Sequence, residues 1–248
     1  MLQGKTIVIT GALGMLGRSA VPMFLQHGAN IVASDITPLE KCREVQEAAE
    51  QYGESRFLYM QADLTGEEQV KSLMEAVDGK FGRLDGGYFN VYRNVWKPLL
   101  QLSLAEWEET VRGTMTSTFL CCKYAVPLMI RTGGGSIVNT SSVLGHVPKK
   151  GCLAYGAGKA GVDQMTRVIA KDYAEFGIRA NVLAPGDFKS PERLAKLTEK
   201  HHEAMRQDTM LGRSGSTDEI NQVAAFLLSD ASSYVTGAVY SADGGFHS

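Results

Sequence analysis

The sequence predicts an α/β fold in which a parallel β-sheet is covered on both faces by helices. Short β-branched runs alternate with longer amphipathic stretches through most of the chain, and such alternation is typical of βαβ crossovers. The apolar runs do not alternate with polar residues, as expected of strands that are buried on both faces. At 248 residues, of which 44% are hydrophobic, the chain is long enough to bury a substantial core as one domain over residues 1–248.

The periodicity of apolar residues assigns most of the individual elements. The clearest strands are predicted at Thr6–Thr10, Asn30–Ser34, Arg56–Gln61, Ser136–Thr140 and Arg179–Ala184. The helical stretches are predicted at Leu16–His27, Leu39–Tyr52, Glu67–Phe81 and Leu104–Arg131. No internal repeat, low-complexity tract or linker interrupts this order, which favours a single domain.

Charge and composition narrow the classes of partner. The 25 basic and 27 acidic residues leave a formal charge of −2, which gives no reason to expect nucleic acid or a membrane surface. No apolar stretch approaches the length that spans a bilayer. The cysteines lack metal-type CxxC spacing, so no metal is expected, and Cys121 and Cys122 are predicted to be small core residues. We therefore expect a reduced, soluble, cytoplasmic protein.

A glycine-rich turn follows the first strand and leads directly into a helix. The turn holds Gly11, Leu13, Gly14, Leu16 and Gly17. Glycines allow the backbone to approach a pyrophosphate closely, while free N–H groups at the helix N-terminus face the anion. Leu13 occupies the place of the second glycine in the usual GxGxxG spacing, so an ordinary glycine-bearing turn is the alternative. We expect these residues to border a dinucleotide.

The second strand leads into an acidic residue, Asp35, which is followed by Ile36. At the close of the first βαβ unit, a carboxylate can accept hydrogen bonds from the adenosine ribose hydroxyls. The same carboxylate repels a 2′-phosphate, so it favours NAD over NADP. A loop or helix-capping aspartate is the alternative. Together with the glycine-rich turn, Asp35 predicts NAD as the cofactor, with Ile36 beside it.

Tyr155 and Lys159 open a stretch that is predicted to be helical through Ala170. Positions four apart share one helix face, and a nearby ammonium lowers the pKa of a phenol from its reference of about 10. Ser142 is the second residue after the strand Ser136–Thr140, at the sheet edge where parallel sheets hold their ligands. The sequence thus predicts a cleft with an acid–base tyrosine. A surface lysine beside a half-buried tyrosine is the alternative.

With the glycine-rich turn, these residues make the sequence resemble the short-chain dehydrogenase/reductase family over essentially its whole length. Other matching segments are Asp63-Leu64, Asn181–Gly186, and Tyr234–Gly237 leading to Asp243–Gly245. The resemblance implies a Rossmann-like, doubly wound sheet in three α/β/α layers. It implies an NAD-dependent oxidoreductase that interconverts a small secondary alcohol and a ketone. It further implies a homotetramer with the segment Tyr234–Ser248 at a subunit interface.

The resemblance also implies roles for single residues. Tyr155 would exchange a proton with the substrate oxygen, Ser142 would hold that oxygen, and Lys159 would lower the pKa of Tyr155 and contact the nicotinamide ribose. The remaining implied cofactor positions are Asp63 and Leu64 beside the adenine, Asn90, and Pro185, Gly186, Phe188 and Ser190 around the nicotinamide.

Three departures from the family pattern bear on activity. The glycine spacing TGxxGxxG resembles the branch that contains epimerases. Phe89 and Tyr92 replace an asparagine and a glycine, and the Tyr92 ring would crowd the nicotinamide side of the cleft or shape its substrate side. Thr114 replaces an asparagine that is thought to hold a water of the proton relay. Since a hydroxyl both donates and accepts, we expect Thr114 to hold that water with poorer geometry.

Two alternative functions stay open. The turn spacing favours a non-redox enzyme on the same fold, such as an epimerase, dehydratase or isomerase. The three substitutions favour an NAD-binding sensor or scaffold with weak activity. Outside the catalytic residues, His146 is expected in a loop, His201 and His202 on the solvated face of a charged helix, and residues 187–211 in a substrate lid.

Overall fold

A computed structural model describes residues 1–246 of the chain. Within them, one seven-stranded parallel sheet has the order β3-β2-β1-β4-β5-β6-β9. Its strands are β1 (Thr6–Thr10), β2 (Asn30–Asp35), β3 (Phe57–Gln61), β4 (Gly86–Phe89), β5 (Gly135–Thr140), β6 (Ile178–Pro185) and β9 (Val239–Ala242). The chain winds outward from β1 to β3, then returns to β4 and winds the other way, so the strand order reverses between β1 and β4.

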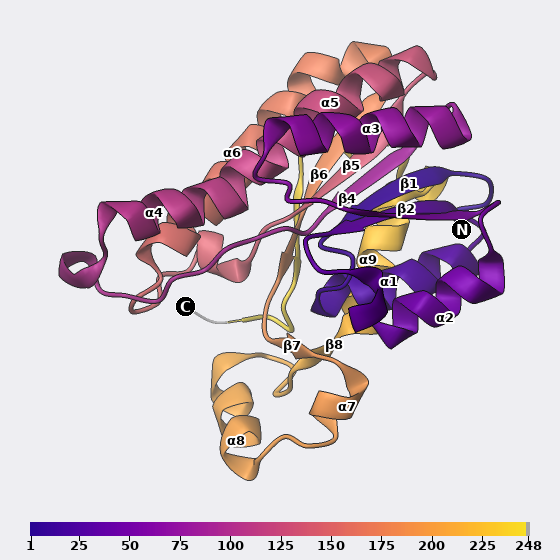
Figure 1. Ribbon diagram of the computed structural model, residues 1–248. Coiled ribbons are helices and arrows are strands. Elements are labelled where there is room, and N and C mark those ends of the chain that lie inside the picture. The colour runs from indigo at the N-terminus through magenta and orange to yellow at the C-terminus, as the bar shows by residue number, and fades with distance from the viewer. Residues whose placement is uncertain (247–248) are drawn as a thin grey trace.

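Helices cover both faces of this sheet (Figure 1). They are α1 (Met15–Gln26), α2 (Arg43–Tyr52), α3 (Glu67–Phe81), α4 (Leu104–Val111), α5 (Ser117–Arg131), α6 (Leu153–Tyr173) and α9 (Thr217–Leu228). One apolar core joins α1, α2 and α9 to one face of the sheet, and a second joins α3, α5 and α6 to the other. Burial of apolar surface on both faces stabilises the sheet. The predicted three-layer, doubly wound fold is confirmed.

The second core also contains Cys121 and Cys122, both buried and free, as predicted. Across residues 1–246, no helix combines the length and the apolar character that crossing a bilayer requires.

The predicted single helix Leu104–Arg131 is wrong at its centre. The five residues Arg112–Thr116 form a π-helical turn, η3, between α4 and α5. At Gly113, an added Cβ would lie only 2.4 Å from the Arg93 Cβ, so the loop at Arg93 packs directly on the helix backbone. The Thr114 hydroxyl binds that loop as well. Inserted turns of this kind are frequent at functional sites.

Two other local expectations are corrected. The stretch Leu39–Tyr52 is split into a 3₁₀ turn, η1 (Leu39–Lys41), and α2, because Cys42 between them is extended, with φ −134° and ψ 97°. Gly86 and Gly87 are poor strand residues, yet they form half of β4. Glycine is needed at position 87 because a Cβ there would lie only 2.5 Å from the Phe89 ring. The aromatic Phe89 therefore depends on the glycine before it.

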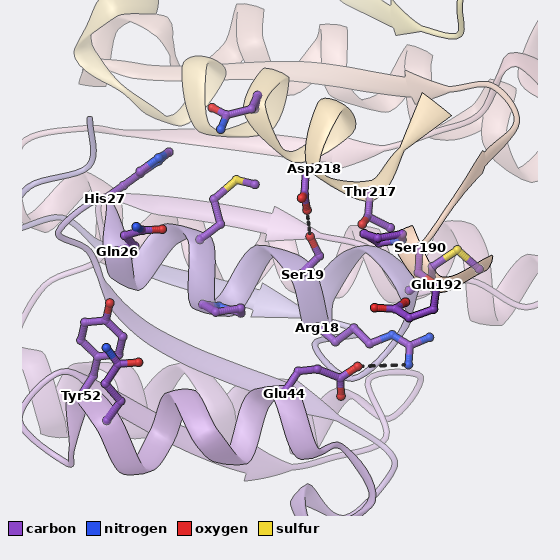
Figure 2. Close-up of a pocket in the computed structure, with 16 residues that line it drawn as sticks. Arg18, Ser19, Gln26, His27, Glu44, Tyr52, Ser190, Glu192, Thr217 and Asp218 are labelled. Carbon is purple, nitrogen blue, oxygen red and sulfur yellow. Dashed lines mark hydrogen bonds and ion pairs between the residues drawn. The ribbon is translucent and has the colours of Figure 1, made fainter. Parts of the chain in front are cut away.

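The predicted lid leaves the sheet after β6. It contains β7 (Phe188–Lys189), α7 (Pro191–Leu194) and α8 (Glu199–Asp208), and it stands apart from the three layers in Figure 1. After the lid the chain continues into β8 (Gly215–Ser216), which pairs with β7. Between the lid and α1 lies an open groove of about 540 Å³ (Figure 2). In this groove Arg18 pairs with Glu44 at 3.7 Å and Ser19 donates to Asp218 at 2.6 Å.

The prediction that His201 lies on a solvated face is wrong. Its Nε2 atom lies 2.8 Å from the Ser214 hydroxyl and 3.2 Å from the Asp187 carboxylate. Burial opposes ionisation of Asp187, but hydrogen bonds from Lys189 and Ser214 hold the pKa of its carboxyl below the usual value. Because Asp187 and Ser214 flank the lid at its two ends, His201 fastens α8 to both.

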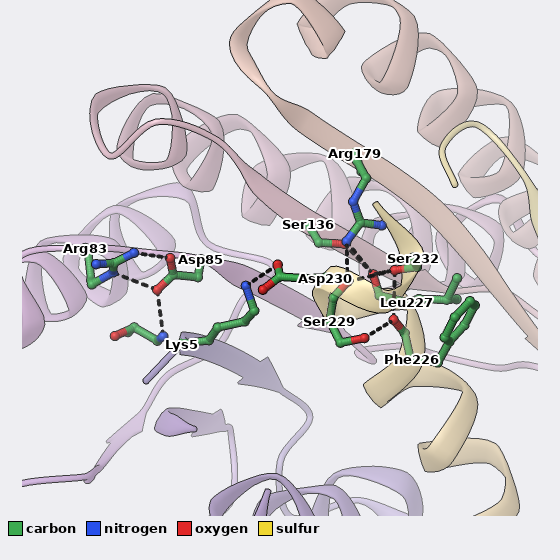
Figure 3. A network of polar contacts seen from close by, with 11 residues as sticks. Lys5, Arg83, Asp85, Ser136, Arg179, Phe226, Leu227, Ser229, Asp230 and Ser232 are labelled. Carbon is green, nitrogen blue, oxygen red and sulfur yellow. Dashed lines mark hydrogen bonds and ion pairs between the residues drawn. The ribbon is translucent and has the colours of Figure 1, made fainter. Parts of the chain in front are cut away.

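A polar network lies where the strands of the sheet begin, which is here called the amino edge (Figure 3). Arg179 donates to the carbonyls of Leu227 and Ser229, both at 3.0 Å, and to that of Val235 at 3.2 Å. The Leu227 and Ser229 carbonyls lie at the end of α9, where helix carbonyls lack intrahelical partners, and Val235 lies in the loop that follows. Asp85 accepts from the Thr6 N–H at 2.8 Å and from Arg83. Each of these groups has a defined partner.

Candidate active site

The carboxyl ends of β1, β4 and β5 meet at one polar cluster. The Asn90 N–H donates to the Thr10 hydroxyl at 3.1 Å, and the Thr140 hydroxyl donates to Asn90 Oδ1 at 2.5 Å. All three residues are buried. Ligands of doubly wound sheets bind at the carboxyl edge, where the strand order reverses. The candidate site is therefore at this edge, beside β1 and β4.

A cavity of about 690 Å³ opens at this edge. Of the predicted cofactor residues, its lining includes Gly11, Gly14, Asp35, Ile36, Asp63, Leu64 and Asn90. These residues follow four different strands, and the fold brings them to one surface. Leu13 lies in the same turn, Gly17 packs beneath it, and the Leu16 side chain is part of the first core.

The glycine-rich turn has the geometry of an anion cradle. A Cβ on Gly17 would lie 2.3 Å from the Gly11 carbonyl oxygen and 2.5 Å from Ala12 Cα, so α1 packs directly on the turn. Gly14 is the N-cap of α1 and offers no side-chain cap. The first N–H groups of a helix lack intrahelical partners and attract an anion. The residues present fit the pyrophosphate of a dinucleotide.

Asp35 is oriented by two backbone groups. Its Oδ2 atom accepts from the Leu13 N–H at 3.0 Å, and its Oδ1 atom accepts from the Thr37 N–H at 3.0 Å. A carboxylate has about four acceptor sites, so two stay free beside the cavity. The side chain can thus accept from ribose hydroxyls without losing its own support.

Ser142, Tyr155 and Lys159 come together beyond β5. Ser142 is the N-cap of η4 (Val143–Gly145), and its hydroxyl accepts from the Leu144 N–H at 3.2 Å. Lys159, which is 1% exposed, donates to the Thr140 carbonyl at 2.6 Å. Its Nζ lies 5.6 Å from the centre of the Tyr155 ring. The first two turns of α6 thus place a phenol and an amine beside a serine hydroxyl.

Burial shifts the pKa values of Tyr155 and Lys159 in opposite directions. It raises the pKa of Tyr155, against the nearby Ser142 hydroxyl, which lowers it. It also lowers the pKa of Lys159 to about 7, against the charge of Asp163. At neutral pH the phenol is therefore protonated, and the amine is near its midpoint. That Lys159 lowers the pKa of Tyr155 once substrate and cofactor are bound stays a prediction.

Asp163 is a buried acid that the sequence reasoning missed. It is 3% exposed and lies one turn after Lys159 on α6. Its Oδ2 atom is 3.2 Å from Nε2 of His146, which lies at the end of the Ser142 loop. Burial raises the pKa of Asp163, while the Ser141 hydroxyl and the charges of His146, Arg167 and Lys159 lower it. The i,i+4 spacing from Lys159 was the available signal.

The Thr114 hydroxyl is hydrogen-bonded to the backbone of Arg93. The hydroxyl donates to the Arg93 carbonyl at 2.9 Å and accepts from the Arg93 N–H at 3.3 Å. The residue is fully buried, and its methyl group lies against Gly158 of α6. Donating to a relay water would require its bond to the Arg93 carbonyl to break, because a hydroxyl has a single donor.

The residues predicted near the nicotinamide lie at the end of β6 and just after it. Pro185 ends β6, and the Gly186 N–H donates to the Ala242 carbonyl at 3.2 Å. Phe188 packs against the first core. Ser190 lines the groove beside α1 (Figure 2). Their place around the nicotinamide stays a prediction.

The fold and this edge define an α/β protein of the doubly wound, dinucleotide-binding type. The model of the family described as enoyl-(acyl carrier protein) reductase matches residues 11–247. The 3-oxoacyl-(acyl-carrier-protein) reductase of Thermotoga maritima is 37% identical, with 98% of each chain covered. The 2,5-dichloro-2,5-cyclohexadiene-1,4-diol dehydrogenase of Sphingobium indicum is 38% identical, with 99% of this chain and 98% of that one covered.

A solved short-chain type dehydrogenase/reductase from Mycobacterium ulcerans superimposes with a TM-score of 0.89. It is 28% identical, with 98% of this chain and 90% of that one covered. The chain belongs to the short-chain dehydrogenase/reductase family, as the sequence predicted. It is related to dehydrogenases and reductases throughout its length, which supports an oxidoreductase with a nicotinamide cofactor.

Proposed function

We propose that this protein is an NAD-dependent dehydrogenase that interconverts a secondary alcohol and its ketone, with Tyr155 as the proton-transfer residue. The observation that carries the proposal is the meeting of Ser142, Tyr155 and Lys159 beyond β5. Next to them is a cavity lined by the glycine-rich turn and Asp35. A proton-transfer group and a cradle for a dinucleotide are the two parts that such a reaction needs.

Each residue has a role in ketone reduction. The Ser142 hydroxyl donates to the substrate oxygen and holds it beside the phenol. The bound nicotinamide supplies the hydride that reaches the carbonyl carbon. Tyr155, which burial keeps protonated, gives its proton to the oxygen as negative charge develops there. A protonated Lys159 stabilises the phenolate that is left, and it contacts the nicotinamide ribose. Alcohol oxidation runs through the same positions in reverse.

Asp35 supports NAD as the cofactor. Its carboxylate lies at the cavity wall with two acceptor sites free for ribose hydroxyls, and its charge repels a 2′-phosphate. The name of the Sphingobium relative makes cyclic secondary alcohols the first substrates to test. The test is NADH formation with a panel of cyclic and acyclic secondary alcohols. We expect turnover of at least one alcohol with NAD; no turnover across the panel would contradict the proposal.

A second candidate is an NAD-binding protein with weak turnover. It is favoured by the Thr114 hydroxyl, whose two bonds to Arg93 leave it without a free donor for a relay water. Calorimetry that detects NAD binding, together with an inactive alcohol panel, would favour this candidate.

The proposal includes a homotetramer. Large apolar side chains of α4, α5 and α6 are exposed in the single chain, among them Leu104, Phe119 and Val168. Such surfaces are typical of contacts between subunits. Of the predicted interface segment Tyr234–Ser248, residues 247–248 lie outside the described residues. Light scattering at micromolar concentration should give the mass of a tetramer, and a monomer would contradict this part of the proposal.

A further inference from the structure

Tyr92 connects the cavity to the catalytic group. It follows β4 by three residues and lines the 690 Å³ cavity together with Gly11, Gly14 and Asp35. The same lining includes neither Ser142 nor Tyr155 nor Lys159. Since Tyr92 touches both sides, its ring lies at the boundary between the cavity and the catalytic group.

The ring also covers the catalytic amine. The Tyr92 and Tyr155 rings meet edge to face, with centres 5.8 Å apart and an interplanar angle of 70°. Lys159 Nζ lies 5.7 Å from the Tyr92 centre and 5.6 Å from the Tyr155 centre. Both distances suit a cation–π contact. The two rings help to keep Lys159 buried, and burial is the main cause of its lowered pKa.

The backbone beside Tyr92 is fixed, but its side chain has room. Both backbone polar groups of Arg93 bind Thr114, the Arg93 side chain pairs with Glu109 at 2.7 Å, and Gly113 packs against the Arg93 Cβ. Tyr92 is nevertheless 58% exposed. Its ring therefore borders solvent, into which it can rotate about its side-chain bonds without movement of the loop.

We propose that Tyr92 is a gating residue of the active site: its ring closes the path from the cavity to Lys159 and turns outward when a dinucleotide binds. This rests on the proposed function, because only a ligand that lies along the cavity and reaches Lys159 must displace the ring. The aromatic and cation–π contacts favour the closed position. A binding-competent state that is populated only in part weakens the apparent affinity by that fraction.

The first test measures the dissociation constant of NADH by fluorescence titration for wild type, Tyr92→Ala, Tyr92→Phe and Tyr234→Ala. Tyr92→Ala removes the closed state and should bind NADH about 5–20-fold more tightly. Tyr92→Phe keeps the ring, and its affinity should stay close to that of wild type. Tyr234 is exposed in the single chain and does not line the cavity, so Tyr234→Ala is the control for loss of a tyrosine. Because its segment is a proposed subunit interface, the mass of this variant by light scattering is first matched to that of wild type.

The second test needs no nucleotide. An amine-reactive acylating reagent is applied to each variant, and acylation of Lys159 is followed by mass spectrometry. Tyr92→Ala should be acylated at Lys159 about 10-fold faster than wild type, because the amine is uncovered, whereas Tyr92→Phe and Tyr234→Ala should match wild type.

The outcomes separate the gate from the proposed function. If wild type and Tyr92→Ala bind NADH equally well, or if the variant binds more weakly, the gate is overturned and the cofactor assignment stands. If no variant binds NADH or NADPH, the proposed function is overturned and the gate with it. Tighter NADH binding together with faster acylation of Lys159 supports the gate.

Discussion

Buried polar groups at the amino edge of the sheet, where the strands begin, differ in their partners from those at the carboxyl edge, where the strands end. At the amino edge, the Arg179 guanidinium donates to three carbonyls, and Asp85 accepts from a backbone N–H and an arginine. At the carboxyl edge, Lys159 has one carbonyl acceptor and two aromatic rings. Asp163 is a buried acid that faces His146 at 3.2 Å, and burial raises the pKa of its carboxyl. The charged groups at the amino edge have hydrogen-bonding partners, whereas at the carboxyl edge burial shifts the pKa values of Lys159 and Asp163 toward their neutral forms.

This difference indicates where stability and chemistry reside. Buried polar groups without full partners destabilise a protein and are kept mainly where they serve function. We therefore expect substitutions at the amino edge to lower stability with little effect on turnover per folded molecule. Substitutions at the carboxyl edge should lower turnover per folded molecule without lowering stability.

Lys159→Met should combine a large loss of catalysis with a gain of stability. The variant loses the charge that stabilises the Tyr155 phenolate, and turnover should fall by about 10²–10⁴-fold. The same variant should be more stable than wild type at pH 7 by roughly 1–3 kcal/mol, because an apolar side chain replaces a buried amine. Steady-state kinetics and urea unfolding measure the two quantities. A variant that is both inactive and less stable would contradict the contrast between the edges.

The pH dependence of that stability difference has a defined sign. The folded pKa of Lys159 is lowered to about 7, whereas the unfolded value is about 10.4. Between these values the unfolded chain binds the proton and the folded chain does not, so wild-type stability rises with pH. The advantage of Lys159→Met should therefore shrink from pH 7 to pH 10. Unfolding midpoints of both proteins across this window measure it.

Arg179→Ala should give the largest loss of stability. It removes charge-assisted hydrogen bonds to three carbonyls near the end of α9, and we expect the free energy of unfolding to fall by about 2–4 kcal/mol. Turnover per folded molecule should be unchanged below the unfolding transition. Lys5→Ala is the control, since its partner Asp230 is exposed and such pairs contribute about 0–1 kcal/mol.

Asp35→Ser should change cofactor choice at the carboxyl edge by a smaller amount. Without the carboxylate, a 2′-phosphate is no longer repelled, so the preference for NAD over NADP should fall by about 10-fold. The ratio of kcat/KM for the two cofactors measures this preference. Wild-type protein that works equally well with NADP would contradict the role assigned to Asp35.

Thr114→Val should have the smallest effect on turnover, because the wild-type hydroxyl is already bound to Arg93. We expect a decrease of about 2–5-fold through the loss of these hydrogen bonds and a displaced Tyr92 loop. Thr114→Asn should keep or raise turnover if a relay water can then be held. Both variants are compared at saturating substrate, and a large loss in Thr114→Val alone would assign the hydroxyl to the relay.

The sequence predicted the parts that depend on local pattern. The apolar run Thr6–Thr10 coincides with β1, and the glycines and Asp35 come to one cavity because they follow adjacent strands. The spacing of Tyr155 and Lys159 placed both on the first turns of α6. Each of these features is determined by strand ends and helical periodicity, which are visible in the chain itself.

Features that depend on distant packing were missed. The π-helical turn at Arg112–Thr116 depends on the loop at Arg93, and the burial of Asp163 depends on the loop that ends at His146. His201 fastens the lid only because Asp187 and Ser214 meet at its base. In each case the partner lies more than ten residues away along the chain, where no period or motif indicates it.

The most direct test of the central claim is the turnover of Tyr155→Phe with saturating NAD and the best alcohol of the panel, measured beside its NADH affinity. The variant keeps the ring that packs beside Lys159 and loses only the transferable proton. We predict that turnover falls by about 10²–10⁴-fold while NADH affinity stays close to that of wild type. Retention of most of the turnover would contradict the assignment of Tyr155 as the proton-transfer residue.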